Sequence, residues 1–395
     1  MKRSIDRIRT THTGSMPRPQ ELMDAMRALA AGRPIDATSY ESALTRHVAE
    51  TVRRQVEAGI DVVNDGECSK PSFNAYISER LGGFEARNPP NPPEHARASV
   101  GPIDMAGRDA VMFQDYYQGV LENSPFKNVI RMPPRVCVGP VTYIGQAKIA
   151  RDIANLKAAM ATARADEGFL PSFSPVPIQA NEYYASSEEY ALAYGEAMRI
   201  EYRAILDAGL VLQIDDPRMV SLWDSQRSST LPEYRKWMAG RVELINHALR
   251  DLPKERIRYH TCYGVNFGPR VSDLQLADVL DVLLTIEAGA YSFEAANPRH
   301  DHEWRVPQQV KVPAGRILIP GAVTHSNVMI EHPEVVADRI ERWARAAGRE
   351  NILVGNDCGF QSTAGNTEIP PSIAWAKLGS LGEGARIASK RLWAS

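Results

Sequence analysis

Short apolar runs that end in polar residues recur along the chain, and helix-length amphipathic stretches separate them. Two such runs are 59–67 (GIDVVNDGE) and 208–217 (AGLVLQIDDP). The stretches that precede them, 40–58 and 187–207, have the spacing of apolar residues that is typical of helices. Strands that alternate with helices indicate a parallel sheet covered by helices. The pattern therefore predicts an α/β fold.

Nine segments have strand character, whereas a (β/α)8 TIM barrel has eight strand positions. They are 9–15, 59–67, 135–142, 168–176, 208–217, 256–264, 288–294, 316–325 and 351–359. We predict a single barrel domain over residues 1–395 and expect 168–176 to lie outside the barrel. A doubly wound sheet is the alternative, but no G-x-G-x-x-G fingerprint follows the first strand.

The segment 68–134 interrupts the alternation of strands and helices. It contains the proline-rich NPPNPPEH at 88–95 and the aromatic residues Phe113, Tyr116 and Tyr117. Because it is too long for a plain loop, we expect an insertion over the C-terminal face of the barrel. A lid that closes the barrel mouth and a packed surface excursion without a gating role both fit this segment.

Charge and hydropathy exclude several classes of protein. The chain has 46 basic and 48 acidic residues, mixed throughout, and its formal net charge is −2. This distribution offers no basic surface for nucleic acid. The most apolar window, 276–290, is interrupted by acidic residues, so it predicts a helix leading into a buried strand and no membrane span.

The N-terminal residues 1–11 are polar and rich in arginine, without the apolar stretch of a signal peptide. The four cysteines are far apart in the sequence, unlike the disulfide framework of a small secreted protein. Reduced thiols or metal ligands are the better interpretation. We therefore expect a cytoplasmic protein.

Residues capable of chemistry stand where the predicted strands end. They are Ser15, Glu67, Asp215, His260, Cys262, Glu294, His325 and Cys358. Enzymes with a (β/α)8 barrel build their active sites at the C-terminal ends of the strands. The sequence therefore predicts one active site at this face.

Four of these residues form a set of metal ligands. His260 and Cys262 are two positions apart on one strand, so both side chains point to the same face. An isolated H-x-C pair is more often two core residues, but Cys358 and Glu294 end two further strands. One imidazole, two thiols and one carboxylate suit tetrahedral zinc. We predict a zinc site at His260, Cys262, Glu294 and Cys358.

Eight short motifs, in the same order, resemble those of the cobalamin-independent methionine synthase family. Four look like its zinc-site motifs: HTCYG (260–264), SFE (292–294), THS (324–326) and NDCG (356–359). The others are THTGSMPRP (11–19), DGE (65–67), GPVT (139–142) and QIDDP (213–217). The amino-terminal half of the long members of the family has no counterpart here. Residues 291–306 and 372–390 are more similar to the epoxyalkane:coenzyme M transferase branch.

The resemblance implies a zinc-dependent transfer of a methyl group from a 5-methyltetrahydrofolate-type donor to homocysteine, activated as a zinc-bound thiolate. It implies that Glu67 and Asp215 hold the amino group of homocysteine and that Ser15 contacts its carboxylate. Two buried carboxylates also favour a cation between them on physical grounds. His325, at a strand end, is the expected general acid for the leaving group.

Three alternatives stay open at this point. A basic cluster that includes Arg299 and Arg305 is either a site for an anionic substrate group or a solvated loop. An enzyme of the epoxyalkane:coenzyme M transferase type would alkylate an anionic thiol. A barrel with a structural zinc and a binding or hydrolytic role is the alternative from another class. The expected partners are a small-molecule thiol and an alkyl donor, and a homo-oligomer is compatible with the sequence.

Overall fold

The computed structural model describes all residues except 89–98, 101–102, 106, 125, 265–267 and 395. The proline-rich motif therefore lies, apart from Asn88, outside the described residues. Seven strands form one sheet in which all neighbours are parallel. In spatial order they are β1 (Val62–Val63), β6 (Glu167–Phe173), β8 (Val211–Asp215), β9 (Ile257–His260), β10 (Ala290–Phe293), β11 (Ile317–Val323) and β12 (Gly355–Asn356).

The N-terminal segment 9–11 connects the two edges of this sheet. Thr10 forms a parallel bridge with Val354, and the Thr11 amide donates to the Val354 carbonyl at 2.8 Å. On the other side, the Val62 amide donates to the Thr10 carbonyl at 3.0 Å. This segment therefore fills the eighth strand position. The predicted (β/α)8 barrel is confirmed.

The expectation that 168–176 lies outside the barrel is wrong. That segment forms β6, which pairs with β1 and β8 inside the barrel. The excursion is instead β5 (Arg135–Tyr143), which pairs with β2 (Leu81–Ala86) and β7 (Ala180–Asn181). A barrel strand is covered on both faces, and β6 is buried after its first residue whereas β5 is half-exposed. The alternation of strands and helices in the sequence does not distinguish these two environments.

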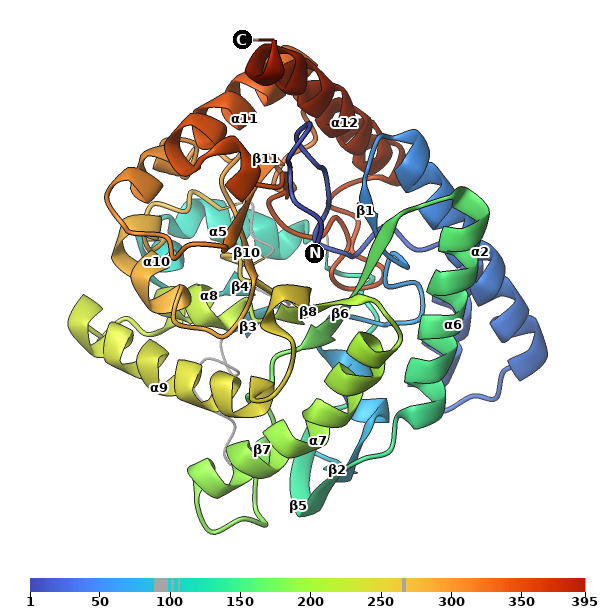
Figure 1. The fold of residues 1–395 in the computed structure, drawn as a ribbon. Helices are drawn as coiled ribbons and strands as arrows, with labels where there is room; N and C mark the ends of the chain where they lie inside the picture. Colours follow the sequence, from blue (N-terminus) through green and yellow to red (C-terminus); the bar gives the residue numbers. More distant parts are fainter. Residues whose placement is uncertain (89–98, 101–102, 106, 125, 265–267, 395) are drawn as a thin grey trace.

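Helices surround the barrel (Figure 1). The longest are α2 (Ala37–Glu57), α6 (Gln146–Ala163), α7 (Ser187–Asp207), α9 (Leu231–Leu249), α11 (Pro333–Ala347) and α12 (Pro371–Trp393). Shorter ones are α1 (Gln20–Ala30), α8 (Arg218–Ser225), α10 (Leu276–Leu283), η2 (Lys254–Arg256), η3 (Glu303–Gln308) and η4 (Arg349–Asn351). The apolar faces of α2 and α7 are buried in the core, which confirms the helices expected at 40–58 and 187–207.

A buried arginine holds the N-terminal segment inside the barrel. The Arg258 guanidinium, on β9, lies 3.5 Å from the centre of the Phe169 ring. Its Nε donates to Gln213 at 2.6 Å and its Nη1 to Thr11 at 2.7 Å, while Nη2 donates to the His12 carbonyl. Burial lowers the pKa of Arg258 to about 9. These bonds fix where the chain leaves the barrel toward Ser15.

The segment 68–134 contains η1 (Ala75–Glu79), β2, β3 (Ser99–Val100), β4 (Ile103–Asp104), α4 (Arg108–Met112) and α5 (Gln114–Glu122). Arg108 donates to the Trp223 carbonyl on α8, which follows β8. The Asp109 carboxylate accepts from the amides of Val271 and Ser272, in the loop after β9, at 3.0 Å each. The segment is thus anchored to loops at the C-terminal ends of the strands. A gating role stays a prediction.

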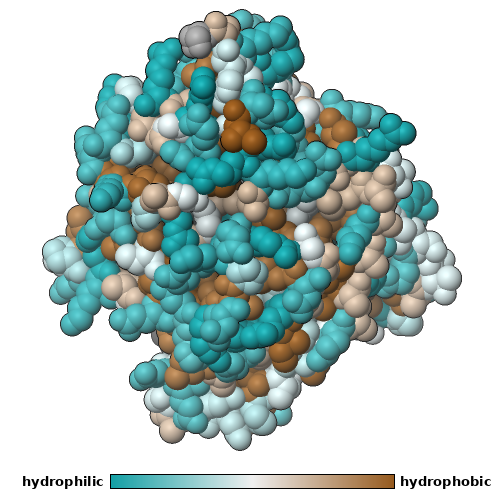
Figure 2. Space-filling view, in the orientation of Figure 1, coloured by the Kyte–Doolittle hydropathy of each residue, from teal (hydrophilic) through white to brown (hydrophobic). Residues whose placement is uncertain are grey.

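The molecular surface in Figure 2 is mostly polar, with apolar residues scattered between charged ones. No helix among the described residues combines the length and the apolar character needed to cross a bilayer. The window 276–290 becomes α10 followed by β10, as expected.

One close helix contact gives a test of the packing around the barrel. A Cβ on Gly382, in α12, would collide with the Ala58 carbonyl at the end of α2. Gly382→Ala should therefore lower the free energy of unfolding by about 1–3 kcal/mol, the usual cost of overpacking. Gly379→Ala is the control on the same helix, because a Cβ there meets no described atom within 4 Å. It should raise stability by about 0.5–1 kcal/mol through helix propensity. Urea denaturation measures both, and equal effects would contradict this packing.

Candidate metal centre

Three of the four predicted metal ligands meet at the C-terminal ends of β9 and β12. The ligand atoms of His260, Cys262 and Cys358 lie within 4.8 Å of one another, and the two Sγ atoms are 3.1 Å apart. The hydrogen bond with Cys262 and burial raise the pKa of Cys358 well above its usual range. A divalent cation would offset the cost of ionising two buried thiols. This donor set therefore fits zinc.

The His260 ring has the orientation and charge state that a metal ligand needs. Its Nδ1 lies 3.1 Å from the Ser292 hydroxyl, so Nε2 carries the free lone pair when Nδ1 donates. A hydrogen bond at the second ring nitrogen commonly orients metal-binding histidines. Burial, together with Arg258 and His325, lowers the pKa of His260 to about 3. The ring is neutral at physiological pH.

The structure places the Glu294 carboxylate in a neighbouring cluster. Oε1 accepts from the Tyr263 amide at 2.8 Å, and Oε2 accepts from Arg270 at 2.8 Å and from Asn297 at 2.9 Å. Glu294 still contributes to the raised pKa of Cys358, so the two side chains are within electrostatic range. Its role as a fourth zinc ligand stays a prediction.

Glu294 also groups with His325 and Asp357, whose ligand atoms all lie within 4.8 Å of one another. His325 is buried, and neither ring nitrogen has a hydrogen-bond partner of ordinary geometry among the described residues. Burial lowers the pKa of His325 to about 4, although the Asp357 carboxylate opposes the shift. His325 is therefore uncharged at neutral pH.

Sequence reasoning missed two residues that position this cluster. Asp357 accepts from the amides of Ala295 and Ala296 at 2.7 Å each, and so holds the chain directly after Glu294. The only signal was its place beside Cys358 in the NDCG motif. Arg270 binds both Glu294 and Asp273 at 2.8 Å. It lies in an irregular loop, where no periodicity singles it out.

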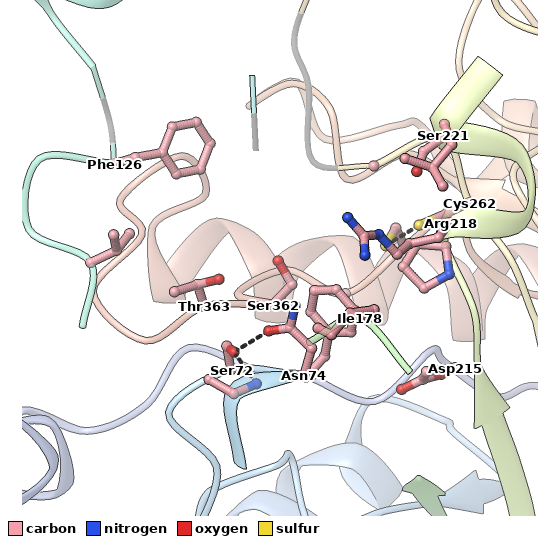
Figure 3. A pocket seen from close by; sticks show the side chains of 18 of the residues that line it. Ser72, Asn74, Phe126, Ile178, Asp215, Arg218, Ser221, Cys262, Ser362 and Thr363 are labelled. Atoms are coloured by element: carbon pink, nitrogen blue, oxygen red, sulfur yellow. Dashed lines mark hydrogen bonds between the residues drawn. The ribbon is translucent and has the colours of Figure 1, made fainter. Parts of the chain in front are cut away.

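A cavity of about 1070 Å3 opens at the C-terminal face of the barrel. The predicted site residues Ser15, Glu67, Asp215, His260, Cys262 and Cys358 line it. Figure 3 shows Asp215 and Cys262 at one side, with Ser72, Asn74 and Phe126 of the segment 68–134 on the other. His325, Glu294 and Arg299 are absent from the described lining. The structure thus separates the predicted site into a cavity wall and a layer behind it.

Two glycines bring Ser15 and Glu67 to the cavity. Gly14 has a φ of 131°, and a Cβ there would lie 2.9 Å from the Glu67 carboxylate. A Cβ on Gly359 would collide with the Ser15 hydroxyl. Only glycine allows the N-terminal turn to pack this closely on both sides. This is the physical reason for the glycines in the GSMPR and DCG motifs.

Glu67 and Asp215 form a buried acidic pair. Burial, followed by the charge of Glu67, raises the pKa of Asp215 well above its usual range. Gln213 donates to Asp215 at 2.6 Å, whereas Glu67 Oε2 has no hydrogen bond among the described residues. The nearest guanidinium nitrogen, on Arg18, is 3.9 Å from that oxygen. The charges of Lys70 and Arg258 lower the pKa of Asp215, but burial and Glu67 outweigh them, so the pair is only partly compensated and attracts an ammonium group.

The predicted role of Arg299 in binding substrate has no support in this geometry. Its Nε donates to the Arg270 carbonyl at 3.1 Å and its Nη2 to the Val271 carbonyl at 3.2 Å. Next to Arg299, burial alone would lower the pKa of His300. The hydrogen bonds of His300 with Asp273 and Glu303 outweigh burial and raise that pKa to about 9. The basic cluster thus braces the loop that carries Arg270. Its spacing in the sequence did not reveal these backbone partners.

Replacement of the paired cysteines tests the metal site. Cys262→Ser and Cys358→Ser should each reduce zinc from about one ion per chain to near zero, because a thiolate ligand is lost. Elemental analysis of the purified proteins measures this. Cys137→Ser is the control, since Cys137 lies on β5, and it should keep its zinc. Full zinc occupancy in either of the first two variants would contradict the ligand assignment.

Comparisons with known proteins agree with this geometry. A methionine synthase of Thermococcus kodakarensis is 24% identical over 388 residues, covering 97% of this chain and 94% of that protein. A 5-methyltetrahydropteroyltriglutamate–homocysteine methyltransferase of Mycolicibacterium paratuberculosis is 24% identical over 92% of this chain, but only 41% of that protein is covered.

Solved structures show the same fold. A B12-independent methionine synthase from Shewanella in complex with selenomethionine superposes with a TM-score of 0.71 at 18% identity, covering 98% of this chain and 100% of the other. The model of the catalytic domain of cobalamin-independent synthase matches residues 8–167 and 175–375. The closer resemblance to the epoxyalkane:coenzyme M transferase branch stays a prediction. The chain belongs to the cobalamin-independent methionine synthase family, through its catalytic domain.

Proposed function

We propose that this chain transfers a methyl group from a 5-methyltetrahydrofolate-type donor to the thiol of homocysteine. The observation that carries the proposal is a single cavity that holds both a metal-binding trio and an acidic pair. A metal held by His260, Cys262 and Cys358 would bind the sulfur of the acceptor, and the negative charge of Glu67 and Asp215 would attract its amino group. The names of the relatives support the same reaction.

Zinc is the metal that the donor set of His260, Cys262 and Cys358 fits, with Glu294 as the proposed fourth, exchangeable ligand. A bound zinc ion supplies a Lewis acid that lowers the pKa of a substrate thiol, so that the reactive thiolate exists at neutral pH. The chain holds all four side chains buried, three of them in the cavity wall and Glu294 behind it. Asp357 and Arg270 would keep Glu294 close to the site without filling the cavity.

Glu67 and Asp215 orient the acceptor through its ammonium group, and Ser15 donates to its carboxylate. An unpaired buried carboxylate costs several kcal/mol, and the bound ammonium offsets this cost. The acceptor is thereby held at its amino-acid end, while its sulfur is directed toward the thiol pair. Holding both reactants in place turns a bimolecular step into an effectively unimolecular one.

His325 is the proposed proton donor for the donor nitrogen, which is a poor leaving group until it is protonated. Because burial keeps the ring uncharged at neutral pH in the free protein, this role requires His325 to take up a proton when the reactants bind, which the nearby Asp357 carboxylate favours. His325 lies behind the cavity wall. Its ring must therefore reach into the cavity to give a proton to the bound methyl donor. Its place in the cluster with Glu294 makes metal binding the competing role.

The geometry weighs against two alternatives. A structural zinc would lie away from the cavity with all its positions filled by protein, whereas His260, Cys262 and Cys358 line the cavity. The cations expected for an anionic thiol were Arg299 or Arg305; Arg299 binds two backbone carbonyls, Arg305 binds the His302 carbonyl, and neither is in the described cavity lining. The epoxide-opening reaction therefore loses the support of that cluster.

A panel of thiols tests the proposed function. The zinc-loaded enzyme should form methionine from 5-methyltetrahydrofolate and homocysteine, and should leave coenzyme M, glutathione and cysteine unmethylated. Zinc-edge absorption spectroscopy should show one sulfur added to the metal when homocysteine is present, and none with the other three thiols. A preference for coenzyme M in both measurements would contradict the proposal.

The same assay includes variants of the acidic pair. Glu67→Gln and Asp215→Asn should each weaken homocysteine binding about 10- to 100-fold, the effect of losing one charged hydrogen bond, while zinc content stays unchanged. The affinity for 4-mercaptobutanoate, which lacks the amino group, should not fall. Equal losses for both thiols would show that the pair acts on the fold instead of the ammonium group.

His325→Ala tests proton transfer. The variant should retain zinc and bind homocysteine, but its turnover number should fall about 100- to 10,000-fold, the usual contribution of a general acid. Elemental analysis, calorimetry and steady-state kinetics measure the three properties. Loss of zinc in this variant would instead assign His325 as a metal ligand.

A further inference from the structure

Arg218 is a cation of the cavity wall to which the proposed reaction has so far given no role. It is the first residue of α8, directly after the strand end that carries Asp215, and it lines the cavity. Figure 3 shows its side chain beside the cavity, on the same side as Cys262 and Ser221. No hydrogen bond or ion pair joins its guanidinium to any residue that the structure describes, and its side chain is partly buried.

The neighbouring carboxylates are engaged elsewhere. Asp216, two residues before Arg218, receives both Nε and Nη2 of Arg241 at 2.9 and 2.7 Å. Asp109 caps the amides of Val271 and Ser272. Asp273, also in the cavity lining, pairs with Arg270 and with His300. The Asp216 charge still acts on Arg218 without a direct contact, so the protein neutralises the guanidinium only in part and leaves room for an anionic ligand.

The surroundings make this neutralisation favourable. Burial and the Arg241 charge both lower the pKa of Arg218, so an anion placed beside it would relieve an electrostatic cost. The Ser221 hydroxyl, three residues later, lies on the same face of α8 and lines the same cavity. A planar guanidinium and a nearby hydroxyl together suit a carboxylate.

The size of the cavity points to the methyl donor as the bearer of that carboxylate. At about 1070 Å3 the cavity exceeds what a small amino-acid thiol fills, and drug-sized ligands occupy roughly 300–1,000 Å3. The acceptor already has proposed contacts for both of its charged groups, at Ser15, Glu67 and Asp215. Apolar residues such as Phe126 and Ile178 line the remaining wall and suit a flat ring system.

We propose that Arg218, assisted by the Ser221 hydroxyl, binds a carboxylate of the methyl donor and so selects donors with an anionic tail. The inference rests on the proposed methyl transfer and assigns the residue that recognises the tail of the second reactant. Arg218 is a specificity-determining residue in this scheme. It contacts the tail of the donor, away from the carbon that is transferred.

Calorimetry on the zinc-loaded enzyme tests this with two probes, 5-methyltetrahydrofolate and a 5-methyltetrahydropterin that lacks the glutamyl tail. Arg218→Gln should weaken folate binding about 10- to 100-fold and leave pterin binding within twofold, because only the folate carries carboxylates. Arg218→Lys should retain part of the affinity through its charge. Ser221→Ala gives a milder second test if Arg218→Gln fails to fold. Arg203→Gln, an exposed arginine on α7, is the control and should change neither value.

Three outcomes would overturn the inference. They are an unchanged folate affinity in Arg218→Gln, an equal loss for both probes, and a selective loss of homocysteine affinity relative to 3-amino-1-propanethiol. The last result would move the carboxylate from the donor to the acceptor. A wild-type enzyme that binds the folate but forms no methionine would contradict the proposed function alone. Selective loss of folate binding in Arg218→Gln would still support the anion site.

Discussion

The Arg258 guanidinium, buried inside the barrel, holds the two ends of the sheet together around the N-terminal segment. It binds Thr11, His12 and Gln213 at the same time, and the segment pairs with β1 on one side and with Val354 on the other. Because the segment is held there, the chain leaves the barrel at its C-terminal face and places Ser15 against Gly359. Groups more than 340 positions apart thereby meet in one cavity.

The chemistry of that cavity depends on buried charge that the protein compensates only in part. Two thiols 3.1 Å apart, the Glu67–Asp215 pair and Arg218 all gain from a bound ion or a charged group of a reactant. A folded protein tolerates such groups where binding repays their cost. The separation of negative and positive groups in one cavity matches an acceptor with an ammonium group and a donor with a carboxylate.

Behind the cavity wall, a second network connects the segment 68–134 to the metal centre. Asp109 holds the backbone of the loop after β9, Arg270 in that loop binds Glu294, and Asp357 holds the chain that follows Glu294. A carboxylate with these partners has a defined position when it is not needed as a ligand. An exchangeable ligand requires this kind of support, since an unpaired buried carboxylate would be costly.

The sequence by itself determined the barrel class and the floor of the site. Apolar periodicity identified the helices, and the alternation of side chains along strands placed His260 and Cys262 on one face. Parallel strands in a barrel end at one rim, so the sequence also placed Ser15, Glu67, Asp215 and Cys358 at that rim. Only the tertiary structure decided that β6 is inside and β5 outside, because local pattern does not record which faces become covered. It also decided that Glu294 binds Arg270 and that Arg218, instead of Arg299, lines the cavity. These are contacts through space between loops, and no sequence period encodes them.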